Sequence, residues 1–101
     1  MKNKLGKPEA RAHVFYSGRV QGVGFRYTAE RLAMELVLNG FVKNLPDGRV
    51  ELVCEGPKKQ IESLLDKIKI NPALGQHIRK ASCAWENPTG EFSDFRVEFV
   101  S

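Results

Sequence analysis

The sequence predicts a single α+β domain in which two helices pack on one face of an antiparallel sheet. Apolar residues recur with strand and helix periods in the order strand, helix, strand, strand, helix, strand, strand. Each predicted helix has one apolar stripe, so both helices need a buried surface such as one face of a sheet. A chain of 101 residues has room for one core of this kind.

The first half of the chain predicts a strand, a glycine-rich turn and a helix. Apolar residues alternate over residues 11–17, and this strand ends at Gly18. From Phe25 the apolar period becomes three and four residues, which predicts a helix. Its stripe consists of Phe25, Ala29, Leu32, Ala33 and Leu36. We expect Asn39-Gly40 to end the helix, because both residues readily adopt left-handed backbone angles.

The second half predicts a hairpin, a second helix and two further strands. Residues 41–45 and 49–55 flank the turn signal Pro46-Asp47-Gly48. Gly56-Pro57 opens the second helix and Asn71-Pro72 closes it. Residues 77–86 predict a strand whose imperfect alternation suits a bulge, and a short extra strand holds Phe95, Val97 and Phe99. The βαββαβ order is that of a ferredoxin-like sandwich.

Charge and composition narrow the class of protein. Residues 1–10 read as a flexible basic tail and residues 11–101 as the single domain. A net charge of +4 favours anionic partners. No apolar run approaches the ~20 residues of a membrane span, and no apolar segment follows the basic start as in an export signal. We therefore expect a cytoplasmic protein with no membrane partner.

Cysteine and histidine positions argue against a disulfide or a metal centre. The strands holding Cys54 and Cys83 should flank the first strand, about 10 Å apart, which is too far for a disulfide. Together with His13 and His77 they lack the paired spacing of a zinc site. We expect reduced thiols, no metal and no cofactor.

The turn between the first strand and the first helix carries the chemical signal. Its glycines allow successive N–H groups to point at an anion beside the positive end of the helix dipole. Arg26 adds a planar fork of donors that matches two phosphate oxygens. The alternative that the glycines only permit a tight bend stays open at this point. Nucleotide fingerprints do not fit, because the Lys-Ser/Thr of a Walker loop is absent and Tyr27 stands where a dinucleotide loop needs a small residue.

Two motifs resemble a known family. The run Gly18-Arg19-Val20-Gln21-Gly22-Val23-Gly24-Phe25-Arg26 resembles the first signature of the acylphosphatases. The run Gly40-Phe41-Val42-Lys43-Asn44, continued by Gly48, Val50 and Gly56, resembles the second. Both occur in the order and at the separation of that family, and the resemblance extends over roughly residues 11–100, nearly the whole chain.

The resemblance implies a metal-independent hydrolase that splits acyl phosphates into a carboxylate and inorganic phosphate. Arg26 falls at the phosphate-binding catalytic arginine, and Asn44 falls at the asparagine that orients the attacking water. The backbone N–H groups that hold the phosphate correspond to Gln21, Gly22, Val23, Gly24 and Phe25. Small-molecule acyl phosphates are the implied partners, and inorganic phosphate or sulfate is expected to fit the same site. A monomer is the default for such a domain, and the physiological substrate stays open.

Two alternatives have the same fold. An RNA-recognition module shares the βαββαβ order and suits the charge, but Phe25 and Tyr27 begin a helix and the strand over residues 49–55 has no aromatic residue, so we expect no nucleic-acid partner. We expect Trp85, Phe15, Phe95 and Phe99 to be packing residues. A binding-only domain, like those fused to larger carbamoyl-transfer proteins, is the second alternative, although this chain keeps both Arg26 and Asn44.

Overall fold

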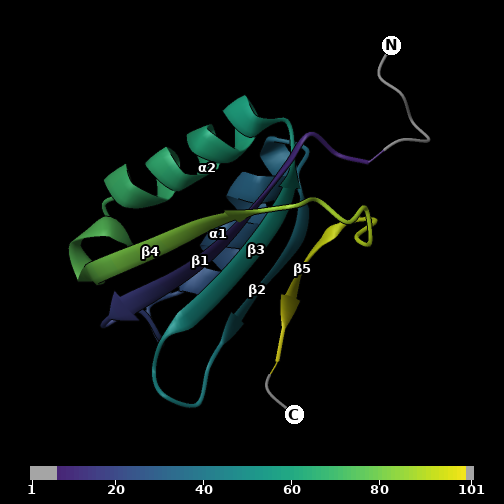
Figure 1. Cartoon of the computed structure of the whole chain (residues 1–101). Coiled ribbons are helices and arrows are strands. Elements are labelled where there is room, and N and C mark those ends of the chain that lie inside the picture. Colours follow the sequence, from purple (N-terminus) through teal and green to yellow (C-terminus); the bar gives the residue numbers. More distant parts are fainter. Residues whose placement is uncertain (1–6, 100–101) are drawn as a thin grey trace.

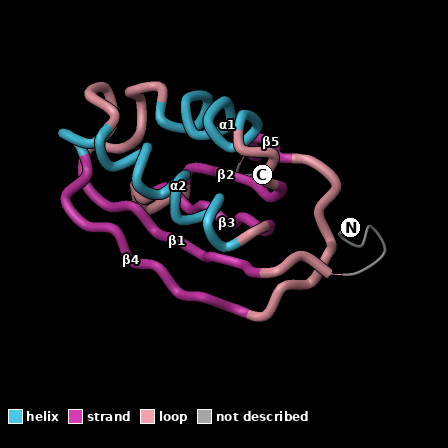
Figure 2. Tube along the Cα trace, turned by 90° about the horizontal axis from the view of Figure 1, so that it is seen from above, coloured by secondary structure: helices cyan, strands magenta, loops and turns pink. Residues whose placement is uncertain are grey.

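A computed structural model describes residues 7–99 and confirms the ferredoxin-like arrangement (Figure 1). The sheet has the strand order β4-β1-β3-β2-β5. Both helices cover one of its faces, as Figure 2 shows. The elements are β1 (Ala10–Gly18), α1 (Phe25–Glu35), β2 (Asn39–Asn44), β3 (Val50–Gly56), α2 (Lys58–Ile70), a short 3-10 helix (Gly75–His77), β4 (Ile78–Glu86) and β5 (Phe95–Glu98).

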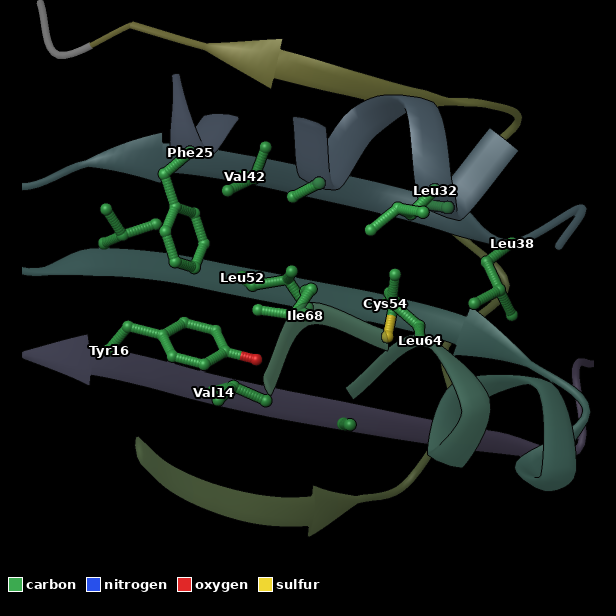
Figure 3. Close-up of a cluster of buried hydrophobic side chains, with 14 of the residues drawn as sticks. Val14, Tyr16, Phe25, Leu32, Leu38, Val42, Leu52, Cys54, Leu64 and Ile68 are labelled. Carbon is green, nitrogen blue, oxygen red and sulfur yellow. The ribbon is translucent and has the colours of Figure 1, made fainter. Parts of the chain in front are cut away.

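The core lies between the sheet and the two helices (Figure 3). Alternate residues of the central strands point at the helices, and the apolar stripes predicted for the helices meet them. Each large side chain buried in this way contributes about 1.5–3 kcal/mol to folding. The core includes Val14 and Tyr16 of β1, Leu52 and Cys54 of β3, Phe25, Ala29 and Leu32 of α1, and Ile61, Leu64 and Ile68 of α2.

The described region includes residues 7–10 of the predicted tail and both helices that could be considered as membrane spans. Of the predicted tail, residues 1–6 lie outside the described part, and Ala10 already pairs with Gly56 as the first residue of β1. The carboxylate of Glu9 accepts a hydrogen bond from the Lys58 backbone N–H at 3.3 Å, at the start of α2. Within residues 7–99, neither α-helix has the length and apolar character needed to span a bilayer.

The two cysteines lie on the strands that flank β1, as predicted. Ala12 pairs with Cys54 of β3, and Val14 pairs with Cys83 of β4. Both thiols are free, Cys54 within the core and Cys83 on the exposed edge strand. Burial raises the pKa of Cys54 to about 12, so this thiol is a packing group and not a nucleophile.

Helix α1 ends earlier than predicted. It stops at Glu35, and the left-handed residue is Val37, with φ 57°, not the expected pair Asn39-Gly40. The N–H groups of Val37 and Leu38 donate to the carbonyls of Met34 and Ala33, the two bonds of a Schellman ending. Burial of Leu38 explains the change, because its side chain is held in the core immediately after the turn. Asn39 and Gly40 are then free to begin β2.

The last strand runs in a direction that the alternation of its residues did not reveal. Strands β1 to β4 pair antiparallel as predicted, but β5 pairs parallel with β2, so the sheet is mixed. The chain leaves β4 at one edge of the sheet and crosses to the other edge before β5 begins (Figure 1). Because β5 is parallel to β2, its C-terminal end lies at the Asn44 end of β2.

A buried carboxylate anchors the first part of the crossing segment, residues 87–94. Glu55 of β3 is 2% exposed and accepts hydrogen bonds from the backbone N–H groups of Thr89 and Gly90 at 2.8 and 2.9 Å. Arg11 donates to the same carboxylate at 2.9 Å. Burial acts to raise the pKa of Glu55, but the hydrogen bonds from Thr89, Arg11 and Gly90 outweigh it and hold the pKa below its ordinary value.

This carboxylate predicts an acid-sensitive contribution to stability. A pKa lower in the folded than in the unfolded chain means that the stabilisation is present above the unfolded value of about 4.3 and is lost as the pH falls through the folded value. Glu55→Gln should lower the free energy of unfolding by about 1–3 kcal/mol at neutral pH. It should also flatten the acid limb of a plot of that free energy against pH, measured by urea unfolding. The exposed Glu62→Gln is the control; equal curves for the two variants would contradict this role.

Candidate active site

The loop between β1 and α1 is anchored at both ends by buried side chains. Val20 is fully buried and Phe25 is 2% exposed, with its ring 4.9 Å from that of Tyr16. Between these anchors Gly22 and Gly24 have φ values of 79° and 81°, and apart from their chain neighbours no atom of residues 7–99 lies within 4 Å of a Cβ built at either position. Glycine is therefore required at these two positions by the backbone conformation and not by a lack of space.

The start of α1 is open to an anion. Gly24 is its N-cap in a left-handed conformation, no side chain among the described residues caps the helix, and its first turn contains no acidic residue. The first N–H groups of a helix have no partner within the helix, and they lie at the positive end of the dipole. In many helices a Ser or Asp side chain satisfies them; here they stay available to a ligand.

Arg26, in the first turn of α1, has aromatic rings for neighbours. Its Cζ lies 5.7 Å from the ring centre of Tyr27 and 5.1 Å from that of Phe99. The ion pairs within residues 7–99 do not include Arg26. Stacking on rings restrains a guanidinium without neutralising its charge or occupying its in-plane donors, which suits it to a bidentate contact with an anion.

The position of Phe99 corrects a prediction. This residue lies beyond β5, is 65% exposed and contacts Arg26, instead of packing within a last strand. The parallel direction of β5 explains the contact, because it delivers Phe99 to the end of the sheet where Asn44 lies. Trp85 is also exposed, at 45%, with the Lys58 ammonium 5.0 Å from its ring centre.

Asn44 is the last residue of β2 and carries an unpartnered buried atom. Its Oδ1 is buried and has no hydrogen-bond partner among the residues that the structure describes. A buried acceptor left unpaired costs about 1–3 kcal/mol. Such atoms are rare in folded proteins and call for a functional reason. An amide oxygen in this state can accept a hydrogen bond from the O–H of a bound water.

One small cavity brings the predicted site together. It has a volume of about 110 Å³, and both Arg26 and Asn44 line it. Drug-sized ligands occupy pockets of roughly 300–1,000 Å³, so this cavity suits a compact group such as a single phosphate. The other lining residues are Val20, Gly22, Gly24, Phe25 and Tyr27.

Two of the predicted loop residues do not line the cavity. Val23 packs against the core, and the side chain of Gln21 turns to the β2–β3 turn, where it donates to two backbone carbonyls. Val20 and Tyr27 line the cavity although the sequence did not single them out as site residues. Tyr27 could have been identified from the sequence, because it follows Arg26 directly.

Two larger hollows within the described part of the chain contain none of the predicted site residues. One, of about 530 Å³, lies between α2 and β4 and includes Tyr16, Lys69 and Cys83. Another lies along α2 itself. Within residues 7–99 no group of three or more His, Cys, Asp or Glu side chains is placed to hold a metal ion. Chemistry, and not size, therefore selects the small cavity as the candidate active site.

Fold and cavity together define a small α+β protein with a site suited to a compact anion, and comparison with known proteins gives the family. The family model described as Acylphosphatase matches residues 12–97. An acylphosphatase of Roseiflexus sp. is 43% identical over 88 residues, which cover 87% of this chain and 94% of that protein. The chain belongs to the acylphosphatase family, and it is a hydrolase.

Solved structures agree with this assignment. The structure of an acylphosphatase from Coxiella burnetii superposes with a TM-score of 0.80 at 37% identity, over 93% of this chain and 99% of that one. The crystal structure of HypF from T. kodakarensis matches at 33% identity with a TM-score of 0.76. The second match covers 88% of this chain but 12% of HypF, so the same fold also occurs as a small part of a larger protein.

Proposed function

We propose that this chain hydrolyses the carboxyl-phosphate bond of acyl phosphates. One observation carries the proposal: a single small cavity is lined by Arg26, by the uncapped start of α1 and by Asn44, whose Oδ1 has no partner among the described residues. The first two groups offer N–H donors and positive charge to a phosphate. The third offers an acceptor to a water.

Phosphate binding is assigned to the loop and to Arg26. The guanidinium donates two parallel hydrogen bonds to two phosphoryl oxygens. The backbone N–H groups of residues 21–25 donate to the oxygens on the side of the helix start. Because these donors are held in place before the substrate arrives, they stabilise the charge of the transition state without reorganising.

Asn44 is assigned to the attacking water. Its Oδ1 accepts one O–H of the water, which turns an oxygen lone pair toward phosphorus. The bond from the water oxygen to phosphorus forms as the bond from phosphorus to the carboxyl oxygen breaks, and the carboxylate leaves with the electron pair. The proton of the water passes to a phosphoryl oxygen of the substrate, because no carboxylate or imidazole of residues 7–99 lines the cavity.

The leaving group explains why so few residues suffice. A carboxylate is the base of an acid with a pKa near 4, so it departs without being protonated and needs no general acid. An alkyl phosphate would expel an alkoxide, which does need a proton. The site therefore suits acyl phosphates and should act poorly on simple phosphate esters.

Release of phosphate from benzoyl phosphate and acetyl phosphate tests the proposal. With a chelator such as EDTA present, both substrates should be hydrolysed at an undiminished rate, inorganic phosphate should inhibit competitively, and glycerol phosphate should be a poor substrate. Loss of activity on chelation would contradict the mechanism. Salt-dependent RNA binding without hydrolysis would instead favour a recognition module. On the sheet face opposite the helices, Arg11 and His13 are bonded to the carboxylates of Glu51, Glu55 and Glu86, so their polar groups are already occupied, which argues against that outcome.

A further inference from the structure

The side chain of Gln21 joins the two halves of the cavity. Its Nε2 donates to the backbone carbonyls of Leu45 and Arg49, both at 2.9 Å. Gln21 belongs to the loop that leads into α1, whereas both acceptors belong to the turn between β2 and β3. We propose that Gln21 is a positioning residue that sets the distance between the phosphate loop and Asn44. This role rests on the function proposed above.

The same two carbonyls accept the hydrogen bonds that close the β2–β3 turn, residues 45–49. Leu45 donates its N–H to the Arg49 carbonyl at 2.8 Å, and Gly48 donates its N–H to the Leu45 carbonyl at 3.1 Å. Each carbonyl therefore accepts one bond from the turn and a second from Gln21. Asn44 comes immediately before Leu45, so a side chain that binds both ends of the turn also restrains the backbone of Asn44.

Few other hydrogen bonds connect these segments. Between residues 19 and 24 the loop is tied by the bond from the Arg19 N–H to the His77 carbonyl, at 3.0 Å, which leads to the β4 side of the sheet. Among the described residues, no backbone hydrogen bond joins residues 20–23 to residues 44–50. The amide of Gln21 is therefore the polar link between the two segments.

An uncharged amide suits this position for a chemical reason. Its nitrogen has two hydrogens, one for each carbonyl, while a hydroxyl has a single hydrogen and a carboxylate has none. The reaction needs the water oxygen, the phosphorus atom and the leaving carboxyl oxygen in line. The water and the phosphate are held by different segments of the chain. A misplacement of about 1 Å can lower the rate about 100-fold. The side chain of Gln21 points to the β2–β3 turn and not into the cavity, so this side chain acts through the segments it joins and not on the substrate.

The test compares Gln21→Ala with Gln60→Ala. Gln60 is a matched control because its Nε2 also joins segments 24 residues apart, donating to the Leu36 carbonyl away from the cavity. For Gln21→Ala we expect kcat for benzoyl phosphate to fall about 10- to 100-fold. The inhibition constant of inorganic phosphate should change less than about threefold. Gln60→Ala should keep wild-type kcat, and urea unfolding should show that both variants remain folded, with the larger stability loss in Gln21→Ala because it gives up two hydrogen bonds.

A second variant separates positioning from mere destabilisation. Gln21→Glu places a carboxylate against two carbonyls and should lose more kcat than Gln21→Ala near neutral pH. Protonation gives the carboxyl group one donor, so the ratio of its kcat to that of the wild type should rise as the pH falls.

Three results would overturn the role of Gln21. The first is wild-type kcat in Gln21→Ala with only a loss of stability, and the second is a phosphate inhibition constant weakened as much as kcat. A flat ratio across pH for Gln21→Glu is the third. A wild-type chain that hydrolyses neither acyl phosphate would instead overturn the proposed function, and this role with it.

Discussion

Arg26→Lys and Arg26→Ala should each lose at least about 1,000-fold in kcat/KM for benzoyl phosphate. The guanidinium is the one cationic side chain that lines the cavity within the described part of the chain, and it offers two parallel donors to the phosphate. A lysine keeps the charge but not the planar fork, so it should not restore activity. Steady-state rates, together with the inhibition constant of inorganic phosphate, measure the effect.

A neighbouring arginine supplies the control. Arg31 lies on the same helix, pairs with Glu35 at 3.4 Å on the surface and is remote from the cavity lining. Arg31→Lys should therefore keep wild-type kcat/KM. Hydrolysis that survives in Arg26→Ala, or a phosphate affinity that this variant leaves unchanged, would show that another group holds the phosphate.

Asn44→Ala should separate turnover from binding. Loss of the amide that orients the water is expected to lower kcat about 100- to 1,000-fold, a size typical of removing one catalytic hydrogen-bonding group. The phosphate inhibition constant should stay within about threefold of wild type, because the anion is held by Arg26 and the loop. Both constants come from the same rate measurements on benzoyl phosphate.

The same variant should have an unusual effect on stability. Oδ1 of Asn44 is buried without a partner among the described residues, so its removal should not lower the free energy of unfolding and can raise it. Asn39→Ala, at the other end of β2, is the control: its Nδ2 donates to the Phe92 carbonyl at 3.4 Å, and it should keep kcat. A strongly destabilised Asn44→Ala, or one with weak phosphate inhibition, would mean that Asn44 serves the fold or the anion instead.

The parts of the fold that periodicity governs were predictable from the sequence. Alternation in β1 and the helical stripe from Phe25 identify which faces are buried, and burial determines how the elements pack. The direction of β5 was not predictable in this way. Alternation of Phe95 and Val97 gives the faces of a strand but neither its neighbour nor its direction, which depend on the segment held by Glu55. The early end of α1 at Val37 follows from the burial of Leu38, a tertiary effect.

The candidate site, too, was only partly predictable from the sequence. Glycine spacing and the position of Arg26 at a helix start are local features, so the phosphate loop could be predicted from the residues themselves. The role of Asn44 came from the resemblance, because nothing local to residues 40–44 points to chemistry. The contacts of Phe99 and of the Gln21 side chain join segments that are distant in the chain, and only the folded structure reveals them.

Titration of isotope-labelled wild-type protein with inorganic phosphate, followed by nuclear magnetic resonance, tests the central claim most directly. The claim is that Arg26 and Asn44 face one anion. The backbone amides of residues 21–25, the side-chain N–H of Arg26 and the side-chain amide of Asn44 should shift along a single saturation curve. Shifts that leave Asn44 unaffected, that saturate separately for the two side chains, or that map to the hollow between α2 and β4 would contradict it.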